Sequence, residues 1–147
     1  MTDHVRKQIR DAAVTALTGL VTTTTDVYPT RMHRVRESQL PCLLIYTLSE
    51  QSEIDALSRP RGLTRQVDLA VEAVAVDNDT LDDTLDLICK EVEVALGNTT
   101  FGGLAKDVIL TSTEVVVDGN SDKKTGAARM TWTVEYRTPE NDPTTTI

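Results

Sequence analysis

The sequence predicts an α/β (α+β) domain: a mixed, largely antiparallel sheet of four or five strands with two helices packed on one face. Two stretches repeat apolar residues at steps of three and four, as amphipathic helices do. Five other stretches either alternate apolar and polar residues or are continuously apolar, as strands are. The elements follow the order α-β-β-β-α-β-β. A chain of 147 residues suits one domain, so we expect residues 1–138 to form it and residues 139–147 to be a frayed tail.

The first helix is expected directly after Thr2 and Asp3, either of which can cap its first turn. Its apolar positions lie on one face: Val5, Ile9, Ala12, Ala13, Ala16, Leu17 and Leu20. Gly19 weakens the last turn, and the β-branched residues 21–25 end the helix. A short strand at residues 27–28 follows.

Residues 40–47 form a nearly continuous apolar run, which predicts a strand covered on both faces. Residues 49–62 are polar and interrupted, so we expect a projecting loop there. Residues 63–76 then predict a long strand with one apolar face, made of Val67, Leu69, Val71, Ala73 and Ala75.

The second helix follows the turn at residues 77–79, with Thr80 and Asp83 resembling a capping box. Its buried stripe is predicted to be Leu81, Leu85, Ile88, Val92, Ala95 and Leu96. Acidic residues in its first turn suit the positive end of the helix dipole. Gly97 and Asn98 end it.

Two alternating runs, residues 107–117 and 127–137, predict a closing β-hairpin. In the second run one face is apolar, with Ala128, Met130, Trp132, Val134 and Tyr136. The other face carries Arg129, Thr131, Thr133, Glu135 and Arg137, which can meet water or a partner. We expect Trp132 to anchor the covered side. The turn between the runs, residues 118–126, suits an interaction loop and simple solvent exposure equally.

Composition limits the function. Hydrophobic residues make up 39% of the chain and aromatic residues only 3%, so the core must be aliphatic. A net charge of −8 argues against a protein that grips nucleic acid along a basic face. A local basic run, with Arg31, His33, Arg34 and Arg36, contrasts with acidic residues 77–86. These segments are either solvated separately or meet on neighbouring subunits.

Nothing in the sequence resembles an active site. The two histidines are far apart, and the two cysteines lack the spacing of a zinc or redox motif, so both are expected to be reduced core residues. We therefore predict no enzyme, no catalytic residue, no cofactor and no metal. Since no segment approaches a signal peptide or a membrane span, we expect a soluble protein of a reducing compartment, with no membrane partner.

The chain resembles the tail terminator proteins of long-tailed bacteriophages, the lambda minor tail protein U-like family. The residues that carry the likeness are the N-terminal helix, the passage RVRESQLPCLLIY at residues 34–46, the long strand leading into an Asp-rich helix start, and the closing strand WTVEYR at residues 132–137. The likeness covers most of the domain. It is a pattern of shape and not a diagnostic signature.

The resemblance implies a structural virion protein, assembled in the cytoplasm of a bacterial host. Its partners would be itself in a ring, expected to be a hexamer, the tail tube protein and the head-tail connector protein. The ring would sit on the head-proximal end of the tube, stop its polymerisation and let DNA pass through a central channel without specific binding. An acidic chain suits such a channel.

We expect the partner contacts to come from charged residues of three segments. The basic run contributes Arg31, Arg34 and Arg36, the long loop Glu50, Glu53, Asp55, Arg59 and Arg61, and the hairpin turn Asp122, Lys123 and Lys124. Two other functions stay open. One is a head-completion or neck connector protein, and the other, less favoured, is a small-ligand-binding or enzymatic α/β domain.

Overall fold

The computed structural model describes residues 2–30, 37–77, 79–118 and 124–147. Its helices are α1 (Val5–Leu17) and α2 (Leu81–Leu96), with a short 3-10 helix at Glu37–Gln39. Its strands are β1 (Val27–Tyr28), β2 (Cys42–Ala56), β3 (Gly62–Asp77), β4 (Asp107–Asp118) and β5 (Lys124–Pro139). Apart from the 3-10 helix, the order of helices and strands, with the short β1 included, confirms the predicted α-β-β-β-α-β-β.

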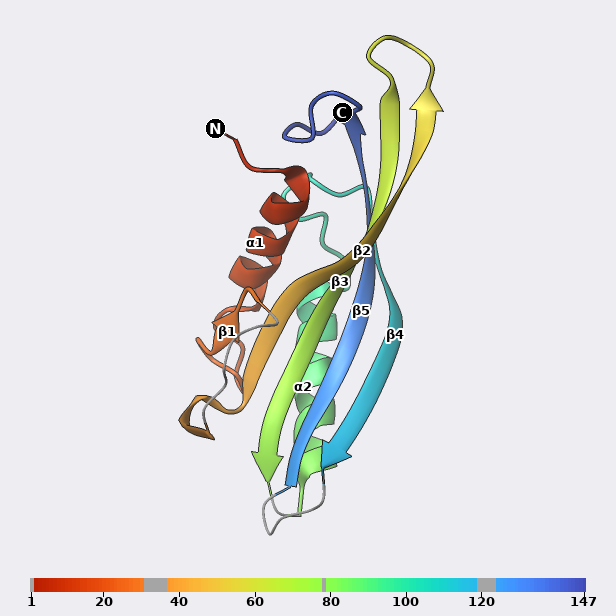
Figure 1. Cartoon of the computed structure of the whole chain (residues 1–147). Coiled ribbons are helices and arrows are strands. Elements are labelled where there is room, and N and C mark those ends of the chain that lie inside the picture. The colour runs from red at the N-terminus through yellow and green to blue at the C-terminus, as the bar shows by residue number, and fades with distance from the viewer. Residues whose placement is uncertain (1, 31–36, 78, 119–123) are drawn as a thin grey trace.

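The five strands form one sheet in the order β1-β2-β3-β5-β4. The short β1 runs parallel to β2, and every other neighbouring pair is antiparallel, so the sheet is mixed and largely antiparallel as predicted. Figure 1 shows a strongly twisted sheet with both helices on the same side of it. The predicted fold class is therefore confirmed.

One apolar core fills the space between this sheet face and the helices. The predicted stripes of both helices contribute to it, except that Ala16 of α1 is exposed, and so do the alternate residues of β3 and β5. Trp132 is 2% exposed, so it anchors the covered side as predicted. Because strand side chains alternate between faces, this arrangement directs the remaining residues of β3 and β5 to the opposite side.

A smaller apolar cluster lies on the opposite face at one end of the sheet. Its buried members are Cys42, Leu44, Tyr46 and Ala70, with Tyr28, Leu40 and Val74 packed against them. Leu43 and Ile45 of the same strand lie in the main core. The prediction that residues 40–47 are covered on both faces is therefore confirmed.

The prediction of a loop at residues 49–62 is wrong. Strand β2 continues to Ala56 and β3 begins at Gly62, so most of this segment belongs to an antiparallel hairpin. We call residues 48–66 the arm, and Figure 1 shows its end projecting beyond α1. Most residues of the arm are polar because it extends past the helices, and the apolar Ile54 and Leu57 are exposed there. Backbone ladder bonds do not require an apolar face, which is why the pattern was misleading.

The helix caps also differ from expectation. The residue before α1 is His4, whose Nδ1 atom accepts a hydrogen bond from the Arg6 amide at 3.0 Å. Asp3 instead pairs with Lys7 one turn later. Helix α1 ends at Leu17, so Leu20 packs against the core from the following loop. Helix α2 begins after Thr80 as predicted, but the Thr80 side chain makes no capping hydrogen bond.

The C-terminal segment is folded back and is not a frayed tail. The Pro143 carbonyl accepts a hydrogen bond from the Val5 amide at 2.8 Å, and the Thr144 carbonyl accepts one from the Gln8 side chain. The Ile147 amide donates to the Arg137 carbonyl at 3.1 Å. The Pro143 contact satisfies one of the free amides at the start of α1, which ties the two ends of the chain together.

Candidate interaction surface

The face of the sheet opposite the helices is the main uncovered surface of the chain, and we call it the open face. The alternation of β2, β3, β5 and β4 places polar side chains on it. Seven carboxylates lie there: Glu53, Asp55, Asp68, Glu72, Asp107, Glu114 and Glu135. Two arginines, Arg129 and Arg137, lie among them. The seven negative and two positive charges give this face an acidic balance.

Both arginines are engaged by carboxylates of the same face. The Arg137 guanidinium donates to both carboxylate oxygens of Asp55, with an Nη2–Oδ1 distance of 2.8 Å. This guanidinium, together with the Thr64 hydroxyl, holds the pKa of Asp55 well below its usual range. Arg129 pairs with Glu114 at 3.1 Å. The two positive charges are thereby neutralised locally.

Five carboxylates of the open face form no ion pair with any residue that the structure describes: Glu53, Asp68, Glu72, Asp107 and Glu135. Glu72 shares a hollow with Arg129, which itself pairs with Glu114. Asp68 accepts hydrogen bonds from the hydroxyls of Thr133 at 3.1 Å and Ser49 at 3.4 Å. Neutral donors such as these orient a carboxylate without removing its charge. The open face therefore presents fixed negative charge to whatever lies opposite it.

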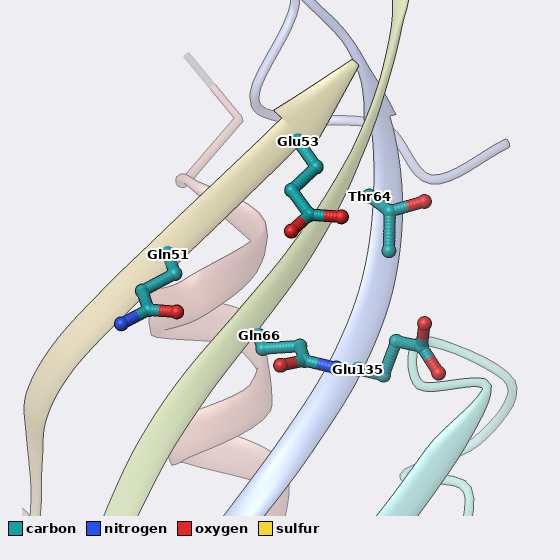
Figure 2. Close-up of a pocket in the computed structure, with 5 residues that line it drawn as sticks. All are labelled: Gln51, Glu53, Thr64, Gln66 and Glu135. Carbon is teal, nitrogen blue, oxygen red and sulfur yellow. The ribbon is translucent and has the colours of Figure 1, made fainter. Parts of the chain in front are cut away.

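A shallow hollow marks the part of the open face nearest the arm. It is lined by Gln51, Glu53, Thr64, Gln66 and Glu135, and has a volume of about 90 Å³. Figure 2 shows these side chains rising from three neighbouring strands, β2, β3 and β5. That volume holds a few water molecules and no ligand of nucleotide size. Its amides and carboxylates suit a hydrated contact with a macromolecule.

The other side of the arm is held to α1 by an ionic cluster. The Glu50 carboxylate is 10% exposed and accepts hydrogen bonds from Arg6 at 2.7 Å, from Arg65 at 3.4 Å and from the Tyr136 hydroxyl. Burial, aided by the Glu50 carboxylate, raises the pKa of Tyr136 above its ordinary value. The cluster fixes the base of the arm, so its orientation relative to α1 is defined.

The residues predicted as partner contacts fall into distinct places. Arg31, Arg34, Arg36, Asp122 and Lys123 lie outside the described residues, as does the side chain of Lys124. Glu50 and Asp55 bind within the chain, as described above. Glu53 lies on the open face, and Arg59 is exposed at the turn of the arm. The Arg61 amide and carbonyl bond to Glu140, which links the arm to the C-terminal segment.

Several residues of the open face were not among the predicted contacts. These are Asp68, Glu72, Asp107, Glu114, Arg129, Glu135 and Arg137. The alternation of residues 127–137 did place three of them on one polar face. The missing information was the strand order, because only the pairing of β3 with β5 brings Asp68 and Glu72 beside that face.

The thiols are buried and unreactive in character. Burial raises the pKa of Cys42 to about 12 and also raises the pKa of Cys89, so both thiols are protonated at neutral pH. Both are free, as predicted.

Within the described part of the chain, no group of three or more His, Cys, Asp or Glu residues is placed to hold a metal ion, and no helix is long and apolar enough to cross a membrane.

Comparison with solved structures gives only distant similarities. No protein family and no curated protein matches the sequence. The chain is similar to a chain in a solved structure described as the virion of a native gene transfer agent particle. The identity is 15%, the match covers 90% of this chain and 92% of that chain, and the TM-score is 0.42.

Proposed function

We propose that this chain is a structural virion protein, a tail terminator that forms a ring on the head-proximal end of a phage tail tube. The ring stops polymerisation of the tube and gives the head connector a docking surface. The observation that carries the proposal is the uncovered, net-acidic sheet face. The sequence resemblance to tail terminators supports it independently, and its WTVEYR segment lies in the interior strand β5.

The open face suits the wall of a channel that DNA crosses. DNA carries one negative charge per about 1.7 Å of helix axis, so a wall that contains lysine or arginine in excess would hold it. On the open face, Arg129 and Arg137 are already paired with carboxylates, and five further carboxylates form no ion pair with a described residue. Such a surface repels phosphate and lets DNA slide.

The arm is the proposed contact between neighbouring subunits. A ring with one rotation axis requires unlike patches to meet, so a projecting element of one subunit must dock on a different surface of the next. The arm carries Leu57, which is 83% exposed, beside the exposed Arg59. Because the Glu50 cluster fixes its base, the arm can dock with little loss of conformational freedom.

The proposed contacts to the tube and the connector are the remaining charged segments. They are Arg31, Arg34, Arg36, Asp122, Lys123 and Lys124. Termination also requires an upper surface that another tube subunit cannot recognise, and like charges facing each other provide that repulsion. A neck connector on the portal side would share the acidic channel, so the position in the particle distinguishes the two functions.

The test is the length of tails assembled without this chain. Electron microscopy of such tails should show tubes longer than normal, and adding the purified protein to assembling tube subunits should restore a fixed length. Tails of normal length that fail to join heads would contradict termination and favour the neck connector. A variant lacking arm residues 53–63 tests the role of the arm, since it should keep the folded core but no longer cap the tube.

A further inference from the structure

Strand β4 leaves one long edge of the sheet open. It pairs with β5 along Asp107–Asp118, and within the described residues no strand pairs with its outer edge. In Figure 1 this edge faces away from the rest of the molecule. Natural proteins commonly protect such edges with Lys, Pro or a covering element. The sequence of β4 contains neither Lys nor Pro.

The edge is also apolar on both of its faces. Ile109 and Val116, on the open face, are 52% and 68% exposed. Val115 and Val117, on the helix side, are 51% and 44% exposed. Four large, exposed apolar side chains on one edge strand indicate a surface that a partner covers.

The residues of β4 are complementary to a second copy of the same strand. The ladder to β5 passes from Leu110 directly to Ser112, so Thr111 is an extra, bulged residue. Before the bulge the odd-numbered residues lie on the open face, and after it the even-numbered residues do. A twofold axis through Thr113 therefore places residues of the same face opposite each other. The pairs are Val108 with Val117, Ile109 with Val116, Leu110 with Val115, Ser112 with Glu114, and Asp107 with Asp118.

Neighbouring registers lose this match. Moving the axis by one ladder step, which keeps the faces matched, brings Ile109 opposite Glu114 or opposite Asp118. Moving it by half a step places open-face residues against helix-side residues. The other edge of the sheet is a poorer partner, because residues 49–53 of β2 are all polar. The centred register alone pairs every large apolar residue of β4 with another.

We propose that two copies of the free protein pair through β4 as an antiparallel, twofold dimer centred on Thr113. The two five-stranded sheets then join into one sheet of ten strands, which is within the usual size of an open sheet. This contact is isologous and differs from the head-to-tail contact of a ring, so it is a state of the protein outside the particle and does not depend on the proposed function.

Charge gives the dimer a characteristic salt dependence. Each copy carries a net charge of −8, so two copies repel each other. Salt screens this repulsion and strengthens apolar association. Dimerisation should therefore become tighter as salt increases, whereas contacts held by ion pairs become weaker.

The test is sedimentation equilibrium of the full chain with two lysine variants. Val116→Lys should weaken dimerisation about tenfold or more, because each dimer loses two apolar cross-strand pairs and gains two unpaired charges. The control is Val94→Lys on α2, where the valine is 78% exposed. Val94→Lys should dimerise like the unaltered protein. A monomeric unaltered protein, or equal affinities for both variants, would overturn the proposal.

A cysteine cross-link tests the register itself. Because Thr113 lies opposite its own copy, Thr113→Cys should give a disulfide-linked dimer under mild oxidation. Ser58→Cys, in the exposed turn of the arm, is the control and should run as a monomer in non-reducing gel electrophoresis. The native thiols are buried and should not interfere. Equal cross-linking of both variants would exclude the twofold β4 contact.

Discussion

At the scale of single residues, Glu50 is the charge on which the position of the arm depends. Changing Glu50→Gln leaves Arg6 and Arg65 facing a neutral amide at a site where the carboxylate is 10% exposed. We expect the free energy of unfolding to fall by about 1–3 kcal/mol, measured by urea denaturation. Glu53→Gln on the open face is the control and should change it by less than about 0.5 kcal/mol. Equal effects would show that the cluster is not stabilising.

Arg137 should control the titration of Asp55. In the unaltered protein, the Asp55 carboxyl should titrate well below its ordinary pKa of about 3.9, and Arg137→Gln should raise that pKa toward the ordinary value. NMR titration of the Asp55 carboxyl carbon measures this pKa in the unaltered protein and in the variant. Arg129→Gln, whose partner is Glu114, is the control and should leave Asp55 unchanged.

The same pair predicts a pH dependence of stability. A carboxyl whose pKa is lowered in the folded state stabilises the protein above its unfolded pKa and loses that contribution as the pH falls through the folded value. The difference in melting temperature between the unaltered protein and Arg137→Gln should therefore be largest at neutral pH and shrink below about pH 4. A difference that grows on acidification would contradict the pairing.

At the scale of elements, the start of α2 lies directly on β5 at Gly126. A Cβ atom at this position would come within 3.0 Å of Leu81 and 3.1 Å of Leu85. Gly126→Val should therefore push the first turn of α2 away and lower the free energy of unfolding by about 1–3 kcal/mol, measured by thermal or urea denaturation. Ala127→Val, on the open face, is the matched control. If Ala127→Val is as destabilising as Gly126→Val, steric contact with α2 is not the cause of the destabilisation.

The elements that the sequence predicted best are those with one buried face. The stripes of α1 and α2 and the alternation of β3 and β5 follow from burial, which a periodic pattern records. The arm was missed because β2 and β3 leave the core there, and ladder bonds between backbones leave no apolar pattern. The cap at His4 and the docked C-terminal segment depend on contacts between distant residues, which no local pattern contains.

The residues of the open face were likewise predictable only where a local pattern records them. The polar face of residues 127–137 was visible as an alternation, but the companions of that face on β3 required the strand order. The loop prediction also obscured the roles of Glu50 and Asp55, which point to opposite sides of a strand and bind different arginines. Alternation identifies which residues share a face, and tertiary pairing decides which faces become one surface.

At the scale of the whole molecule, the acidic open face should keep DNA from binding. A variant with Glu53→Lys, Glu72→Lys and Glu135→Lys should bind duplex DNA in a salt-dependent way, whereas the unaltered protein should not. Gel-shift assays over a range of salt concentrations measure this. The control reverses Asp82, Asp86 and Glu93 on the exposed side of α2, outside the open face. In assembled particles only the first variant should retain DNA.

The proposed function depends most on where the open face lies in the particle. A cryo-electron microscopy map of intact tails, at a resolution that separates strands, measures this directly. It should show a ring of this chain at the head-proximal end of the tube, with the helices outward and Glu53, Asp68, Glu72 and Glu135 lining the channel. A ring with the helices toward the channel, or density for the chain only on the portal side, would contradict the account.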